Sequence, residues 1–107
     1  MKKLQSQILE KLKYYNDGDG KHFYAGWNRS MSINDPQAYF DSLYRDSMKP
    51  KFGNFVKMIE LRSKRAGRGG LELIYKVQMT TGPAGLVCDF GFEEGTYRLV
   101  SFDFVKL

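Results

Sequence analysis

The stretch that decides the fold is GTYRLVSFDF, residues 95–104, close to the C-terminus. Tyr97 and Leu99 alternate in the way of a strand that has one apolar face. Phe102 and Phe104 are also apolar, but their parity along the chain is opposite to that of the first pair. A regular strand would therefore place the two pairs on opposite faces of its sheet.

A β-bulge resolves this conflict, because one extra residue near Val100-Ser101 returns all four side chains to the same face. A bulge also bends the strand that carries it. The stretch predicts a bulge at this point and a strongly curved sheet, with helices packed in the concave side.

The alternating pattern also recurs upstream of this stretch. The expected strands are residues 53–64, 71–81, 85–93 and 96–106. Runs rich in Gly, together with Pro83 and Glu94, separate them and are typical of turns. Because such short connections join antiparallel neighbours, the four strands are expected to form a meander.

The first half of the chain has a helical period instead. Leu4, Ile8, Leu12 and Tyr15 recur at spacings of four, four and three residues, which predicts an amphipathic helix that ends at the turn-forming run 16–20.

Two more helices are expected before the strands. Asp19 is a candidate cap for a short second helix with an apolar side formed by Phe23, Tyr24, Trp27 and Met31. Asp35 and Pro36 are typical of a helix start, and Pro50 is expected to end this third helix. The wide aromatic face of the third helix would consist of Tyr39, Phe40, Leu43, Tyr44 and Met48.

Composition agrees with one folded domain over residues 1–107. Of these residues 42% are hydrophobic and 15% aromatic, which favours a packed core over disorder. Cys88 is the only cysteine, so no internal disulfide can form. The predicted class is α+β, with three N-terminal helices packed on a curved four-stranded antiparallel sheet.

This pattern resembles the nuclear-transport-factor-2-like superfamily, whose members have the cone-shaped cystatin-like architecture. The resemblance lies in the Gly18-Asp19 turn, in Phe52-Gly53 before the first strand, and in the ending at 95–102. Many members end in Gly-x-Trp-Arg-Val-x-Gly-Phe; here Tyr97 replaces the Trp and Ser101 the second Gly.

The chain looks most like small uncharacterised bacterial members of the superfamily. The resemblance implies a cone, pairing of two copies through their sheets, and a periplasmic or cell-envelope location if a leader was removed; otherwise the chain would be cytoplasmic. The superfamily contains enzymes, ligand binders and interaction domains, so the fold does not fix the function.

Enzymes of this superfamily, such as ketosteroid isomerase, use an acid or base at the bottom of the cone. Asp89 and Asp103 are the carboxylates in apolar strand contexts here. Strand alternation directs both away from the core, so the pattern favours solvated carboxylates over a catalytic pair. His22 and Cys88 could form a base and a nucleophile, but the residues around Cys88 are typical of a small buried cysteine. We expect no catalytic residue, metal or cofactor.

The chain is basic, with 17 Lys and Arg residues against 12 Asp and Glu residues and a net charge of +5. Lys64, Arg65 and Arg68 would form a basic hairpin tip. Single-strand nucleic-acid binding also needs aromatic stacking partners, and the tip contains none. Nucleic acid is therefore not the favoured partner.

The aromatic residues provide the remaining functional candidate. An apolar pocket with hydroxyl groups at its mouth is a common form of ligand site. The pocket candidates are Tyr24, Trp27, Phe40, Tyr44 and Tyr75. The sequence favours a non-catalytic module that binds a small apolar ligand or a protein partner, with a pocket-carboxylate isomerase or hydrolase and a basic-hairpin nucleic-acid binder as alternatives.

Overall fold

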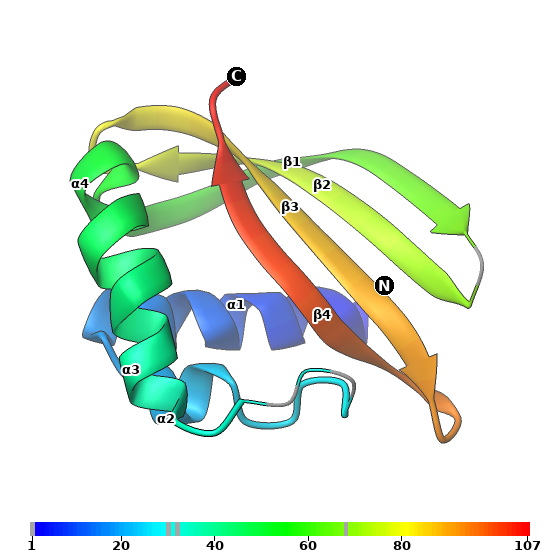
Figure 1. Cartoon of the computed structure of the whole chain (residues 1–107). Coiled ribbons are helices and arrows are strands. Elements are labelled where there is room, and N and C mark those ends of the chain that lie inside the picture. The colour runs from blue at the N-terminus through cyan, green and yellow to red at the C-terminus, as the bar shows by residue number, and fades with distance from the viewer. Residues whose placement is uncertain (1, 30, 32, 68) are drawn as a thin grey trace.

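The computed structural model of the chain describes residues 2–29, 31, 33–67 and 69–107 (Figure 1). Over these residues, four strands form one open antiparallel sheet in the order β1-β2-β3-β4. The strands are β1 (Phe55–Gly67), β2 (Gly70–Met79), β3 (Gly82–Glu93) and β4 (Thr96–Val105). The α+β class and the meander predicted from the sequence are confirmed.

The bulge predicted in the last strand is also present. Asp89 of β3 pairs with Ser101 of β4, and the next pair is Phe90 with Leu99, so Val100 has no partner across the strands. The extra residue puts the apolar side chains of β4 on one face, as expected. Leu99, Phe102 and Phe104 are buried there and Tyr97 is partly buried. β1 has three further register shifts against β2, which the sequence did not predict.

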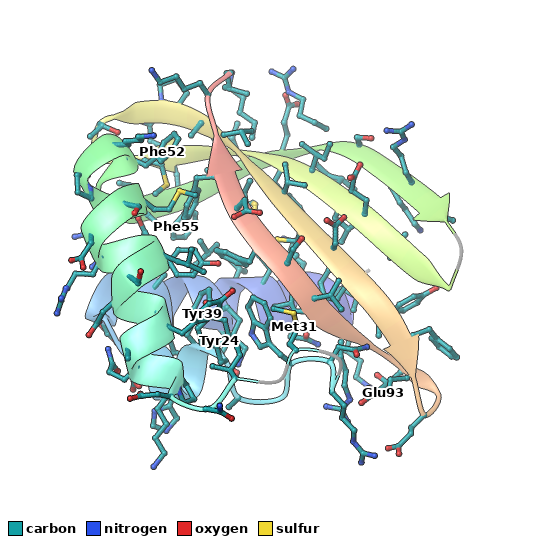
Figure 2. All side chains as sticks on the ribbon, viewed as in Figure 1. Tyr24, Met31, Tyr39, Phe52, Phe55 and Glu93 are labelled. Carbon is teal, nitrogen blue, oxygen red and sulfur yellow. The ribbon has the colours of Figure 1, made fainter. Side chains whose placement is uncertain are left out.

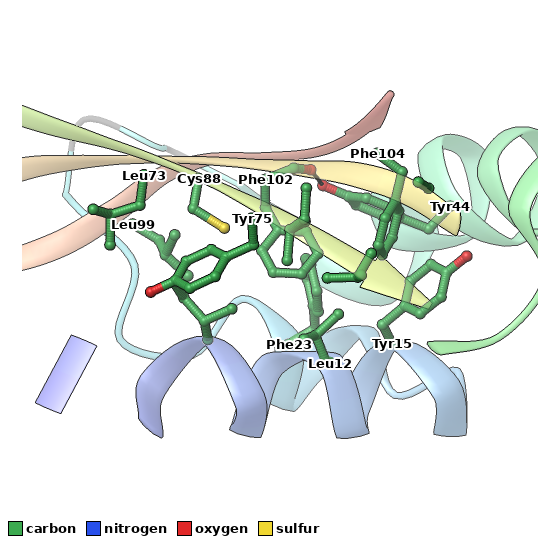
Figure 3. Packing of buried hydrophobic residues seen from close by; sticks show 14 of the residues in the cluster. Leu12, Tyr15, Phe23, Tyr44, Leu73, Tyr75, Cys88, Leu99, Phe102 and Phe104 are labelled. Atoms are coloured by element: carbon green, nitrogen blue, oxygen red, sulfur yellow. Dashed lines mark hydrogen bonds between the residues drawn. The ribbon is translucent and has the colours of Figure 1, made fainter. Parts of the chain in front are cut away.

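All helices lie on one side of the sheet (Figure 1). The first, α1 (Lys2–Asp17), presents the predicted stripe, of which Ile8, Leu12 and Tyr15 are fully buried. Figure 3 shows side chains of this stripe meeting the inward residues of the strands, such as Tyr75 and Phe102.

The second helix is shorter than expected. α2 (Gly20–Phe23) begins at the predicted cap, because the Asp19 side chain accepts a hydrogen bond from the His22 backbone amide. It ends before Trp27 and Met31, so the prediction that these two residues share its face is wrong. Gly26 has a φ of +77°, a left-handed conformation that breaks the helical path.

The third helix continues past Pro50, contrary to expectation. α3 (Pro36–Phe40), the π-helical η1 (Asp41–Met48) and α4 (Lys49–Phe52) follow one another without a break. Asp35 caps the start as predicted. In η1 the backbone bonds reach back five residues, as from the Lys49 amide to the Tyr44 carbonyl. This wider turn precedes Pro50 and relieves the clash that a proline ring makes in a regular α-helix.

The core lies between the helices and the sheet. Its largest fully buried side chains are Tyr15, Tyr75, Phe23, Phe40, Phe90, Phe102, Ile8, Leu12, Leu73, Met79, Leu86 and Leu99. Two tyrosine hydroxyls are satisfied by backbone carbonyls within it: Tyr15 donates to Gly53 over 2.8 Å and Tyr44 to Phe102 over 2.6 Å. These bonds join α1 to the turn between α4 and β1, and η1 to β4.

Candidate functional site

Two adjoining hollows lie beside α3 and η1. The smaller, of about 130 Å³, lies between η1 and β4, and the larger, of about 590 Å³, lies between α3 and the segment before it. Met31 and Tyr39 line both, so the hollows are neighbours; the pair is called the aromatic groove below. Figure 2 shows Tyr24, Tyr39 and Met31 close together between α3 and β4.

The smaller hollow is lined by residues of four segments. They are Tyr24, Trp27, Met31, Tyr39, Leu43, Tyr44, Val100, Ser101, Phe102 and Asp103. The Val100 bulge contributes directly, because it belongs to the part of β4 that faces the hollow.

Backbone-directed bonds hold the aromatic walls in place. The Trp27 Nε1 donates to the Phe23 carbonyl over 2.6 Å. The buried Lys11 Nζ donates to the carbonyls of His22 and Ala25 over 2.9 and 2.7 Å. Burial lowers the pKa of this lysine. Carbonyl groups at the end of a helix lack backbone N–H donors from a following turn. Because these side-chain bonds supply donors instead, they hold the turn that carries Tyr24 and Trp27 in place.

The aromatic rings that line the groove are inclined to one another and do not stack in parallel. The rings of Tyr24 and Trp27 have centroids 4.8 Å apart and an interplanar angle of 61°. Those of Tyr24 and Tyr39 are 5.5 Å apart at 46°. Tyr39 is 43% exposed although it is a large aromatic residue, so it forms the open side of the groove.

The Tyr24 hydroxyl is the unusual group of the site. It is buried, and among the described residues no atom forms a hydrogen bond with it. The Tyr44 hydroxyl donates its proton to Phe102, so it has none to give to Tyr24. Hydrogen bonding with Tyr44 acts against the effect of burial on the pKa of Tyr24, but the two hydroxyls do not have the geometry of a formed hydrogen bond, which leaves the Tyr24 oxygen without a donor. Burial raises the pKa of Tyr24. A buried polar group without a partner costs about 1–3 kcal/mol, which a bound molecule could recover.

The lining of the groove is acidic. Asp35 and Asp103 carry its formal charges, and among the described lining residues there is no Lys, Arg or His. Asp35 is engaged as the cap of α3, accepting from the Ala38 amide over 3.1 Å. Asp103 is exposed, and partial burial together with the Asp89 charge raises its pKa.

The structure separates the five pocket candidates of the sequence. Tyr24, Trp27 and Tyr44 line the smaller hollow. Phe40 and Tyr75 are 0% and 1% exposed and belong to the core outside either hollow.

Sequence reasoning missed Met31, Tyr39 and Ser101 as members of the lining. Tyr39 and Met31 had been placed on the apolar faces of helices, and apolar periodicity does not show how deep a side chain lies. For Tyr39 the available signal was its membership of the wide aromatic face predicted for the third helix.

The two strand carboxylates face away from the core, as predicted. Asp89 accepts a hydrogen bond from the Ser101 hydroxyl over 2.7 Å. Its neighbours on β3, Cys88 and Phe90, are buried on the other face. The raised pKa of Asp103 is the one feature here that an acid–base enzyme would need, but its exposure gives it contact with bulk water.

His22 and Cys88 have different environments. The His22 Nδ1 lies 2.6 Å from an Asp19 oxygen and its ring stacks on Tyr14 at the surface. Cys88 is fully buried, and burial raises the pKa of its thiol. Over the residues that the structure describes, no group of three or more His, Cys, Asp and Glu residues is placed to hold a metal ion.

The basic hairpin has aromatic neighbours that its sequence did not reveal. Phe92, which is 56% exposed, and Tyr97 form a ring pair with centroids 5.1 Å apart. With Lys3 and Lys64 they line a hollow of about 480 Å³. The predicted tip residue Arg68 lies outside the described residues.

Comparison with known proteins supports the fold only. No family model and no curated protein matches the chain. Among solved structures, it is similar to a DUF4783 family protein from Bacteroides ovatus, with a TM-score of 0.53, 10% sequence identity, and coverage of 92% of this chain and 93% of that one. At this identity the likeness shows a shared α+β arrangement. None of the described helices is long and apolar enough to cross a membrane.

Proposed function

We propose that the chain is a non-catalytic binding module whose small, partly aromatic ligand occupies the groove between α3, η1 and β4. The observation that carries this proposal is the Tyr24 hydroxyl, which is buried in the wall of the hollow without a hydrogen-bond partner among the described residues. A ligand atom that bonds to it would remove the cost of that burial.

The form of the groove supports the same conclusion. Ligand sites are mostly apolar concavities with a small number of placed polar groups. Here Trp27, Met31 and Tyr39 supply the apolar surface, whereas Tyr24 supplies a hydroxyl group. The Ser101 hydroxyl is already bonded to Asp89. Together the two hollows have room for a molecule of drug-like size or smaller.

Tryptophan fluorescence provides a direct test, because Trp27 is the only tryptophan of the chain and lies in the wall. We expect 2-phenylethanol, which has one ring and one hydroxyl, to change the emission saturably. Tyr24→Phe should weaken this binding about fivefold, as expected for the loss of one hydrogen bond.

Tyr75→Phe is the matched control, since the Tyr75 hydroxyl is also buried without a partner but lies in the core outside the groove. It should leave the affinity unchanged. A linear, non-saturable response in the parent protein, or equal losses in both variants, would contradict the proposal.

A second candidate is a weak single-strand nucleic-acid binder at the basic hairpin. The observation in its favour is the exposed Phe92, which lies with Tyr97 and Lys64 around one hollow. Aromatic stacking next to basic residues is the usual chemistry of such sites. Binding of an oligothymidine would have to weaken steeply with salt and be reduced by Phe92→Ala.

The cone-shaped architecture, the superfamily membership and the homodimer through the sheet stay predictions. For the dimer, the β1 edge of the sheet has three exposed large apolar side chains, Val56, Ile59 and Leu61. Sedimentation equilibrium tests it: Ile59→Lys should shift a dimer to the monomer mass.

A further inference from the structure

We propose that the ligand of this groove is an organic ammonium ion that carries at least one N–H. Its charged head would lie in the smaller hollow and its apolar body along the larger one. This inference rests on the proposed binding function and adds the chemical class of the ligand.

The aromatic walls suit a cation. Rings attract a positive charge over their faces, and the attraction grows as the site is desolvated. Tyr24, Trp27 and Tyr39 all line the smaller hollow, and the ring of Tyr24 is inclined by 61° to that of Trp27 and by 46° to that of Tyr39. The smaller hollow of about 130 Å³ is well below the roughly 300 Å³ at which ordinary ligand pockets begin, so it suits a head group rather than a whole ligand.

The charge of the groove is opposite to that of the molecule. The chain has a net charge of +5, yet Asp103 and Asp35 are the charged residues of the described lining. Arg45 is the basic residue of η1, and it is occupied by ion pairs with Asp41 at 3.3 Å and Asp46 at 3.0 Å. An anionic ligand would meet carboxylates without a compensating cation.

Asp103 acts on the head-group position itself. Its charge raises the pKa of both the Tyr24 and the Tyr44 hydroxyls, in addition to the larger effect of burial. The carboxylate therefore lies within electrostatic reach of the hydroxyls that line the smaller hollow. A bound ammonium would interact favourably with this carboxylate.

The Tyr24 hydroxyl selects among cations. Its oxygen has no donor among the described residues, and an ammonium N–H can donate to it. A quaternary ammonium has no N–H and would leave the oxygen unpaired, at the cost of a lost hydrogen bond. Primary and secondary amines should therefore bind more tightly than their fully methylated forms.

The test compares four probes that share the phenylethyl body, with the Trp27 emission as the readout. They are 2-phenylethylammonium, its N,N,N-trimethyl form, neutral 2-phenylethanol and anionic phenylacetate. We expect the primary ammonium to bind about tenfold more tightly than the alcohol, and phenylacetate to bind most weakly. The trimethyl form should bind several-fold more weakly than the primary ammonium.

Two variants assign the effect to named groups. Asp103→Asn should weaken the primary ammonium several-fold and leave the alcohol unchanged, whereas the control Asp46→Asn, on the same helix as Tyr44 but outside the lining, should change neither. Tyr24→Phe should abolish the difference between the primary and trimethyl forms. Circular dichroism would confirm that each variant is folded.

The outcomes separate the two proposals. Equal affinity for ammonium and alcohol, or tightest binding of phenylacetate, would overturn the ammonium inference while leaving a binding groove. Either of two further results would also overturn it: an undiminished preference for ammonium over alcohol in Asp103→Asn, or tightest binding by the trimethyl form. Saturable binding by none of the probes would overturn the binding function as well.

Discussion

At the scale of single residues, the buried tyrosines show how similar side chains take different roles. The hydroxyls of Tyr15 and Tyr44 donate to backbone carbonyls, so their burial is compensated. Those of Tyr24 and Tyr75 have no partner among the described residues. The groove explains the first of these unpaired groups, whereas the second lies in the core.

This difference predicts the stability of two variants. Tyr75→Phe removes an unpaired buried hydroxyl, so the free energy of unfolding should stay the same or rise by up to about 1 kcal/mol. Tyr44→Phe removes the bond to the Phe102 carbonyl and should lower it by about 1–2 kcal/mol. Urea denaturation measures both; a larger loss for Tyr75→Phe than for Tyr44→Phe would show that the Tyr75 hydroxyl has a partner.

The raised pKa of Asp103 predicts a pH dependence. Because partial burial and the Asp89 charge favour the protonated form in the fold, the ionised Asp103 reduces stability above its folded-state pKa. This cost disappears as the pH falls through that pKa. Asp103→Asn should therefore stabilise the protein at pH 7, by no more than about 0.5 kcal/mol at this exposed position.

Thermal unfolding followed between pH 7 and pH 3 would test this sign. The advantage of Asp103→Asn over the parent should shrink as the solution becomes acidic. An advantage that instead grows toward low pH would mean that the folded protein favours the ionised carboxylate.

At the scale of the elements, the sequence correctly predicted those features that depend on which face of a helix or strand a side chain occupies. The conflicting parity of Leu99 and Phe102 was enough to predict a bulge near Val100-Ser101, and in the structure the extra residue is Val100. Capping was equally local, since Asp19 and Asp35 bond to amides three residues ahead.

Predictions that depended on the path of the backbone were less successful. The continuation of the helix through Pro50 depends on the wider hydrogen-bond spacing of η1, which single-residue propensities do not encode. For the candidate site, the sequence distinguished apolar from polar positions but not a wall from the core. Tyr24 and Tyr75 are therefore indistinguishable in the sequence, although of the two only Tyr24 lines the groove.

The bulge itself can be tested by deletion. Removing Val100 would restore the regular alternation of β4. Only Ser101 would then separate Leu99 from Phe102, so both would stay on the buried face and Leu99 could still pair with Phe90. The deletion variant should therefore remain folded by circular dichroism, because it avoids the cost of about 2–5 kcal/mol that exposing a core residue such as Leu99, which is 0% exposed, would add. Val100→Ala keeps the extra residue and should also remain folded; an unfolded deletion variant would show that the core needs the bend at Val100.

At the scale of the whole molecule, the sheet presents different chemistry at its two ends. The helix that runs through α3 and α4 and the tip of the β1–β2 hairpin lie on opposite sides of the molecule (Figure 1). The first side holds the acidic aromatic groove, and the hairpin side holds the hollow lined by Lys3, Lys64 and Phe92. A cation and an anion would therefore be drawn to different ends.

Hydrogen exchange can locate the ligand on this map. β2 and β3 each have a strand on both sides and should exchange most slowly in the free protein. Residues 24–29 belong to no helix or strand, and apart from the bond of Asn28 to the Leu99 carbonyl over 2.9 Å their backbone bonds are short-range turn bonds, so they should exchange faster. With 2-phenylethylammonium at ten times its dissociation constant, amides that exchange only after the ligand has left should exchange about tenfold more slowly. We expect this protection in residues 24–29 and in η1, with no change near Phe92; protection confined to the Phe92 side would place the binding site at the hairpin end of the sheet.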